Sequence, residues 1–295
     1  MNLKSTRPIF EFSSHQIAFI LSAALFYLLG AGIARYLGLF QKVQDFWYGL
    51  LFITLISASS FLLLRYFDPK QLQKANQTEL GLIRSRQYLL SGIALLMAGS
   101  VIAYFLIVFS NAEIISIVFM AFIFLTPFVF AIPPIRLADR GYGDLALILS
   151  IAIVHPALAF TIQSGSLHSL LLLISVPLFF FLMAMFVSTG LSEYLQTMLG
   201  GEKNLVILLG WKLAMNLHDW FIILGYALIG VAFFQGLPWT MIWPTFVPLP
   251  VFVFTMYEIH RIREGNKPRW SLLIFSGYAG LGIMLYGLLF MLWFG

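Results

Sequence analysis

The sequence predicts an all-α polytopic membrane protein, a bundle of nine transmembrane helices around a central cavity. Hydrophobic residues make up 61% of the 295 residues and charged residues 10%, and the mean hydropathy is +0.94. Soluble domains carry about 25% charged residues because their surfaces must be hydrated, so most of the outer surface of this chain must contact lipid. The absence of cysteine excludes a disulfide scaffold, a thiol nucleophile and a thiolate metal site.

The predicted spans follow from hydropathy, since a hydrocarbon core about 30 Å thick requires roughly 20 apolar residues per helix. Charged and turn-forming residues divide the sequence into nine such runs, at residues 16–37, 44–66, 87–109, 112–132, 143–162, 167–190, 204–234, 239–257 and 270–294. The start of the chain lacks the order of segments found in a signal peptide, so we expect the first run to be retained. No repeat or flexible linker divides the sequence, which indicates a single domain over residues 1–295.

Lys and Arg are distributed unequally between the predicted loops. Fourteen lie on one side of the membrane, Arg35 and Lys42 lie on the other, and Lys212 falls within a span. The positive-inside rule therefore predicts a cytoplasmic N-terminus and an external C-terminus, with the long polar loops 67–86 and 191–203 in the cytoplasm. Because the cations lie in short loops, they indicate topology rather than a nucleic-acid surface. We expect the protein in the cell membrane of a bacterium or archaeon.

Polar residues interrupt the seventh predicted span. Lys212, Asn216 and Asp219 recur at steps of four and three, so they share one helix face, which we expect to point into the bundle. An ionisable residue inside a membrane span indicates a functional site, since unpaired charge in hydrocarbon costs several kcal/mol. The face suits a proton relay or a head-group pocket, and an internally satisfied polar seam is the alternative. In the fifth span, His155 is expected to be a packed, hydrogen-bonded histidine rather than a ligand.

Several local motifs occur at consistent spacing along the chain. They are Thr6-Arg7-Pro8 followed by the small-residue run 28–34, Ile132-Pro133-Pro134-Ile135-Arg136, Asp139-Arg140-Gly141-Tyr142-Gly143-Asp144-Leu145, and Gln163-Ser164-Gly165. With nine spans and polar loops after spans two, four and six, the chain resembles the UbiA superfamily of intramembrane prenyltransferases. The motifs are nearest to its menaquinone-type branch, which acts on 1,4-dihydroxy-2-naphthoate. The resemblance covers most of the chain and implies a UbiA-like helical bundle.

The resemblance also implies a site for two Mg²⁺ ions, because family members hold a prenyl diphosphate with two acidic clusters. The first, N-D-x-x-D-x-x-x-D, corresponds to residues 64–72, where Asp68 is the one remaining acid and Arg65 replaces an aspartate. The second, D-x-x-x-D, corresponds to residues 193–197, where Glu193 remains. Two unit charges about 4 Å apart repel by about 4 kcal/mol at an effective dielectric of 20, so Arg65 opposes a nearby metal. Asp68 and Glu193 are thus metal-ligand candidates for at most one ion.

Arg65 has two alternative interpretations. It either grips a phosphate with its guanidinium fork, in a cavity like that of a prenyltransferase, or it ends the second helix at the membrane interface together with Asp68. In the resembling family, the loop that contains Asp139, Arg140 and Asp144 here covers the cytoplasmic mouth of the cavity. The resemblance therefore implies that Arg140 and Asp144 bind substrate, and a turn with a local ion pair is the alternative.

Two function classes follow, with a transporter as a third. The resemblance implies transfer of a polyprenyl group from its diphosphate to an aromatic acceptor in quinone biosynthesis, with Mg²⁺ as cofactor. The missing aspartates favour a non-catalytic membrane protein that binds an isoprenoid lipid or a quinone, or that serves a protein partner. If the metals are lost, Arg65, Arg140 and Lys203 are the cations available for a phosphate, and we expect binding to persist where turnover is slow or absent.

Overall fold

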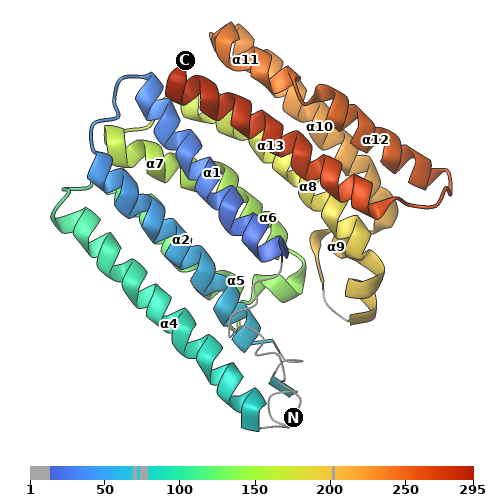
Figure 1. Ribbon diagram of the computed structural model, residues 1–295, viewed down its shortest axis with the longest axis horizontal. Helices are drawn as coiled ribbons and strands as arrows, with labels where there is room; N and C mark the ends of the chain where they lie inside the picture. The colour runs from blue at the N-terminus through green and yellow to red at the C-terminus, as the bar shows by residue number, and fades with distance from the viewer. Residues whose placement is uncertain (1–13, 69–71, 74–78, 201–202) are drawn as a thin grey trace, which may run out of the picture.

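The structure, a computed structural model, describes residues 14–68, 72–73, 79–200 and 203–295 (Figure 1). Within these ranges, eight helical segments are long and apolar enough to cross a membrane. They comprise α1 (Ser14–Tyr36), α2 (Val43–Tyr66), α4 (Glu79–Val108), α6 (Gly143–Leu149) with η2 and α7 (His155–Ser164), α8 (Ser169–Gly200), α10 (Trp211–Phe234), α11 (Trp239–Phe246) with α12 (Leu249–Arg263), and α13 (Trp270–Phe294). The prediction of an all-α polytopic membrane bundle is confirmed.

The fourth predicted span corresponds to a shorter helix, α5 (Ile114–Phe130), of 17 residues. At 1.5 Å per residue, α5 is about 25 Å long, slightly less than the thickness of a hydrocarbon core. It packs along α2, and its last residue, Phe130, contacts Phe61 near the end of α2 with ring centroids 6.1 Å apart. Eight full-length segments and one shorter apolar helix thus replace the nine full-length runs of the prediction.

A π-helical turn, η2 (Ser150–Val154), joins α6 to α7. Pro156 at the start of α7 has no backbone N–H, so the preceding turn cannot close with the usual α-helical bond. Nδ1 of His155 lies 2.6 Å from the carbonyl oxygen of Ser150, which also accepts the backbone N–H of His155. The His155 side chain is buried, and this packed, hydrogen-bonded position agrees with the expectation from the sequence.

The seventh predicted span, 204–234, is not one continuous helix. Gly210 adopts a φ of +79°, which favours glycine, and separates the short α9 (Leu205–Leu209) from α10. Lys212 is therefore the second residue of α10 rather than a residue deep within a span. The prediction of a loop over residues 191–203 is also wrong for most of that range, because α8 continues to Gly200.

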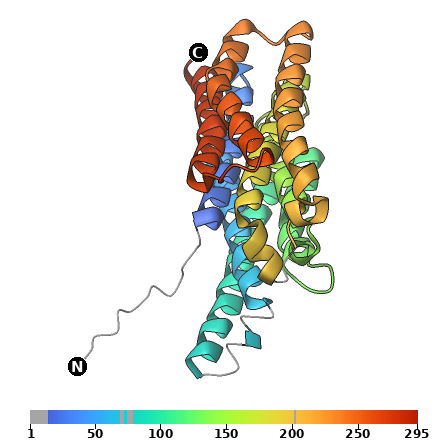
Figure 2. The same ribbon diagram turned by 90° about the vertical axis from the view of Figure 1, so that its right-hand side faces the viewer.

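α1 lies between α2 and α13 and also packs against α7 (Figure 1). Figure 2 shows that the long helices run along one common direction. The small residues of the run 28–34 allow close approach: a Cβ added to Gly30 would lie 2.0 Å from the carbonyl oxygen of Pro156. Trp293 near the end of α13 donates its indole N–H to the carbonyl of Leu28 at 3.2 Å. The small-residue run is therefore a packing surface for two neighbouring helices.

Basic residues of the described part of the chain gather at one end of the bundle, where α1 and α10 begin and α2 and α12 end. We call this the basic end; it contains Arg65, Arg84, Arg86, Arg136, Arg140, Lys203, Lys212, Arg261, Arg263, Lys267 and Arg269. The opposite end contains Arg35 and Lys42. The two ends of the bundle thus differ in their number of Lys and Arg residues, as the two sides of the membrane do in the sequence-based prediction of topology.

Candidate functional site

A central cavity of about 170 Å³ lies between α1, α2, α5, α6, α8 and α13. Its walls are mainly apolar and include four phenylalanines, of which Phe19 and Phe61 contact edge to face at 5.0 Å. The complete lining is Gln16, Ala18, Phe19, Ser22, Phe61, Phe130, Asp144, Leu147, Met185, Phe186, Thr189 and Tyr278. Asp144, the charged residue of the lining, is near the start of α6 and therefore at the basic end.

Asp144 also anchors the short helix α9. Its Oδ2 accepts the backbone N–H of Leu205 at 3.0 Å, and Oδ1 of Asn204 accepts the backbone N–H of Ile207 at 2.8 Å. These bonds satisfy amide groups that have no partner within α9. One oxygen of the predicted substrate ligand Asp144 thus has a structural role.

Glu193 on α8 lies near the same end of the cavity. It is close enough to Asp144 and to Tyr278 for its charge to act on both side chains. Asp144 and Tyr278 line the central cavity, so Glu193 is close to the cavity wall without being one of its lining residues. The predicted residues Asp144 and Glu193, 49 positions apart in the sequence, are brought together by α6 and α8.

Arg65 lies at the rim of the cavity and contacts two other helices. Its Nη2 donates to Oε1 of Gln16, a lining residue, at 3.1 Å, and its guanidinium carbon lies 5.8 Å from the centre of the Tyr88 ring on α4. The contact with Gln16 directs the cation toward the cavity, while the aromatic ring holds its other side. Both features suit an anion at this mouth.

Asp68 follows the end of α2 and is half-buried. The adjacent carbonyl of Phe67 accepts a hydrogen bond from Nη1 of Arg136, and Nε of Arg136 lies 3.0 Å from the exposed carboxylate of Asp139. Arg136 has a left-handed φ of +34°. The local ion pair of this loop is therefore made by Arg136 and Asp139, and Arg136 ties the loop to the end of α2.

Arg140 and Lys203 are exposed and lie on two loops that meet. Nη2 of Arg140 donates to the carbonyl of Pro134 at 2.8 Å. The next residue, Gly141, has a φ of +81°, and a Cβ there would lie 3.2 Å from the carbonyl oxygen of Asn204, the neighbour of Lys203. The two loops thus meet next to these cations, and neither cation lines the cavity, whereas Asp144 lines it and Arg65 contacts its lining residue Gln16.

The implied two-magnesium site does not fit these residues. Among the described residues, no group of three or more His, Asp or Glu side chains is placed to hold a metal ion. Asp68 and Glu193 therefore do not belong to such a group, and Asp144 already accepts a backbone N–H. Mg²⁺ prefers near-octahedral oxygen coordination, which this part of the chain does not supply as a dedicated cage.

The polar face of α10 differs from its predicted surroundings. Lys212 and Asn216 are exposed at the outside of the bundle and do not point into it. Asp219 lies 3.0 Å from Nδ1 of His218 and accepts a hydrogen bond from Nη2 of Arg263 at 2.6 Å. The difference arises because the helix break at Gly210 moves Lys212 to the helix end, where an ammonium group can be hydrated.

Glu258 is a buried acid that no sequence motif singles out. It is 1% exposed and forms an ion pair with Arg261, on its own helix, and with Arg269, which precedes α13. Hydrogen bonding to Glu258 raises the pKa of Arg269 above its usual value. An acid flanked by basic residues at a helix end indicates an ion-pair cluster in the sequence. The sequence does not show which of the basic residues pair with the acid. No motif singles out Gln16 and Tyr278 either, and their only signal is a polar group within an apolar run.

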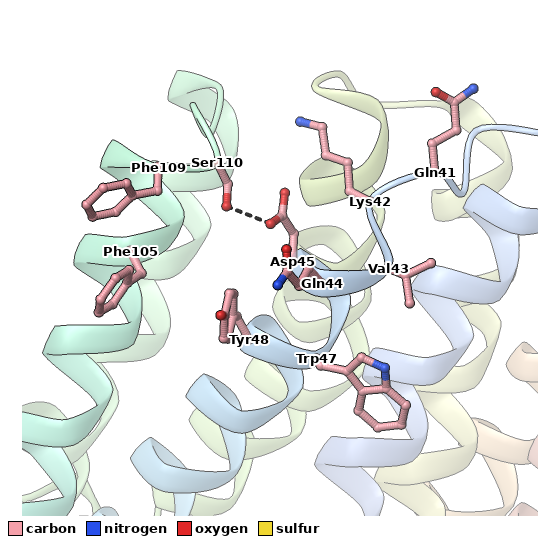
Figure 3. A pocket seen from close by; sticks show the side chains of 10 residues that line it. All are labelled: Gln41, Lys42, Val43, Gln44, Asp45, Trp47, Tyr48, Phe105, Phe109 and Ser110. Carbon is pink, nitrogen blue, oxygen red and sulfur yellow. Dashed lines mark hydrogen bonds between the residues drawn. The ribbon is translucent and has the colours of Figure 1, made fainter.

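A second, open pocket of about 810 Å³ lies at the opposite end of the bundle (Figure 3). It is lined by the α1 to α2 connection, the start of α2 and the end of α4, and Ser110 donates to Asp45 across it at 2.6 Å. The connection is held by Gln163, whose side chain bonds the backbone of Gln41 and Lys42. The Gln163-Ser164-Gly165 motif thus has a structural role far from the central cavity.

No protein-family model matches the sequence, and no curated protein matches it significantly. Solved structures of a UbiA homologue from Archaeoglobus fulgidus are similar in fold. The structure bound to Cd²⁺ aligns with a TM-score of 0.60 and 17% identity, covering 93% of this chain and 99% of that chain. The structures bound to GPP and Mg²⁺ and to DMAPP and Mg²⁺ each align with a TM-score of 0.59 and 16% identity over the same shares. The predicted UbiA-like fold is thereby confirmed.

Proposed function

We propose that this chain is a UbiA-like membrane protein of the prenyltransferase type that binds an isoprenoid diphosphate, or a related isoprenoid lipid, in its central cavity. The observation that carries the proposal is the chemistry of that cavity, whose walls include four phenylalanines and whose lining residue Gln16 contacts Arg65 at the basic end. The structures of the A. fulgidus homologue with GPP and with DMAPP support it. Ligand pockets for drug-sized molecules are about 300–1,000 Å³. A cavity of about 170 Å³ therefore suits a short isoprenoid group, and a longer chain would continue between helices into lipid.

The diphosphate would lie at the cavity mouth beside Arg65, with Arg140 and Lys203 on the loops that approach from outside. Each charge-assisted hydrogen bond contributes about 1.5–3 kcal/mol. Two Mg²⁺ ions would in addition stabilise the negative charge of a departing diphosphate. We therefore propose that binding is retained and that transfer is slow or absent. Where transfer occurs, we propose an aromatic acceptor of quinone biosynthesis, as in the menaquinone-type branch that the sequence resembles.

Binding of GPP to the purified protein in EDTA tests this proposal. We expect measurable binding by calorimetry without Mg²⁺, and Arg65→Ala is expected to weaken it at least tenfold, which corresponds to about 1.4 kcal/mol. Lys42→Ala removes the same charge at the opposite end and is expected to leave the affinity unchanged. Thermal unfolding of both variants establishes that the comparison concerns folded protein.

Two outcomes would contradict the proposal in different ways. Efficient Mg²⁺-dependent release of diphosphate that Asp68→Ala abolishes would establish a metal-dependent enzyme. Failure of GPP and of longer isoprenoid lipids to bind would remove the isoprenoid function altogether.

We also propose nine membrane passes, with α5 as the shorter one, and a cytoplasmic basic end. The chain contains no cysteine, so single cysteines can be introduced without a background. Cysteines at Lys203 and Lys267 are expected to react with an impermeant maleimide only in inverted vesicles, and a cysteine at Ser166 only in intact cells. Equal labelling of all three positions from one side would refute the nine-pass arrangement.

A further inference from the structure

A separate cleft of about 310 Å³ opens between the start of α10 and the end of α12, at the basic end of the bundle. It is lined by Trp211, Lys212, Met215, Asn216, Ile262 and Arg263. Two of these residues are cations and one is an amide. The cleft therefore offers hydrogen-bond donors and positive charge at the level where a transmembrane helix meets the lipid head groups.

Two hydrogen bonds fix the position of the Arg263 guanidinium. Its Nη2 donates to Oδ2 of Asp219 and to the backbone carbonyl of Met215, both at 2.6 Å. Asp219 is itself fixed by the buried His218, 3.0 Å from its other oxygen. Within the described part of the chain, these two bonds of Arg263 use one nitrogen, so Nε and Nη1 are available for an anion. The acid orients the guanidinium without occupying all its donors.

Lys212 adds a second charge that Asp219 does not balance. One carboxylate opposes the two cations of the cleft, and the cleft is net positive. The nearby Arg261 and Arg269 share the single carboxylate of Glu258, so that cluster also has one positive charge in excess. An anionic group is the ligand that this arrangement complements.

The face of α10 below the cleft is apolar and exposed. Continuing from Asn216 by steps of four and three residues leads to Trp220 and Ile223, which are 58% and 46% exposed. One helix stripe thus changes from cationic and polar at its end to apolar within the span. The polar end of this stripe matches the head group of a lipid molecule, and its apolar part matches the acyl chain. A free phosphate would contact the polar end alone.

We propose that this cleft binds the head group of an anionic glycerophospholipid, with the phosphate between Lys212 and Arg263 and an acyl chain along Trp220 and Ile223. Basic pockets between helices at the cytoplasmic surface are known to accept such head groups, and each basic residue near the surface contributes about 1 kcal/mol. The site is distinct from the central cavity and does not depend on the proposed isoprenoid function.

The test uses full-length, delipidated protein in detergent, titrated with phosphatidylglycerol or phosphatidylcholine and observed by native mass spectrometry. We expect preferential binding of phosphatidylglycerol. Lys212→Gln is expected to reduce its affinity about fivefold, the factor that 1 kcal/mol represents. Lys267→Gln removes an equal charge from an exposed loop residue outside the cleft and is expected to change the affinity less than twofold.

A second variant and a competition arm complete the experiment. Ile223→Ser leaves the cations in place and is expected to weaken phosphatidylglycerol binding, while millimolar inorganic phosphate is expected not to compete. Equal effects of the two lysine variants, or no preference over phosphatidylcholine, would overturn the site. Competition by inorganic phosphate together with an unchanged affinity of Ile223→Ser would identify a soluble phosphate as the ligand and overturn the lipid assignment.

Discussion

Replacing Gly30 by alanine is expected to lower the free energy of unfolding by about 2–3 kcal/mol. The added Cβ would lie 2.0 Å from the carbonyl oxygen of Pro156 and 2.6 Å from its Cα. These are backbone atoms at the junction of η2 and α7, so the clash cannot be relieved by a side-chain rotation. Overpacking of this kind typically costs about 1–3 kcal/mol, and the short contact places Gly30→Ala in the upper part of that range. Unfolding by sodium dodecyl sulfate in mixed micelles measures the change.

Gly230→Ala is the matched control, because Gly230 is also inside a long helix and, beyond the backbone of that helix and its two chain neighbours, no atom of the described residues lies within 4 Å of its added Cβ. In a helix interior, alanine is favoured over glycine by about 0.5–1 kcal/mol. The control should therefore be neutral or slightly stabilising. Equal stability of Gly30→Ala and Gly230→Ala would show that α1 and α7 do not pack as closely as described.

Removing the carboxylate of Glu258 should have an effect of similar size. Its oxygens accept hydrogen bonds from Arg261 and Arg269, so Glu258→Ala leaves two cations without their partner. Breaking a buried pair in this way costs about 3–5 kcal/mol. Because both guanidinium groups keep some contact with solvent, we expect a loss near the lower limit, about 3 kcal/mol, measured by the same unfolding assay.

Glu264→Ala provides a control on the same helix end. Glu264 pairs with His260 at 3.2 Å, and the two side chains are 57% and 61% exposed. An exposed pair contributes about 0–1 kcal/mol, so this variant should be nearly neutral. Glu258→Gln retains the shape and one acceptor and should have an intermediate stability. If all three variants were equally stable, Glu258 would not be what fastens α12 to the start of α13.

The apolar segments could be predicted from sequence because lipid imposes one requirement, a long run of apolar residues, on every span. The breaks within the helices could not be located from sequence, because each depends on the backbone dihedral angles of a single residue. Gly210 is one of 23 glycines, and nothing local indicates that it adopts a positive φ. If residues 204–234 formed one helix, Lys212 would lie well inside the membrane. Because the helix breaks at Gly210, Lys212 lies at the start of α10 instead.

The residues near the cavity mouth come from distant parts of the sequence. The resemblance singled out Arg65, Asp144 and Glu193, which come from three different helices and approach the central cavity. Their partners Gln16, Leu205 and Tyr278 depend on tertiary packing and lie far away in the sequence. Apolar periodicity carries no information about such pairs, so the second role of Asp144, as an acceptor for a backbone amide of α9, could be recognised only in three dimensions.

The π-helical turn at Ser150–Val154 determines which face α6 turns toward the cavity, relative to α7. A π-helical turn corresponds to one residue inserted into an α-helix, and each residue advances an α-helix by about 100°. With a regular α-helix in its place, everything before the insertion would be rotated by about that angle about the helix axis, relative to α7. Asp144 would then be turned away from the cavity wall. The direction of the only charged group in the described cavity lining is therefore set by a single-residue insertion two turns away, and a deletion there would redirect it without altering any residue of the cavity.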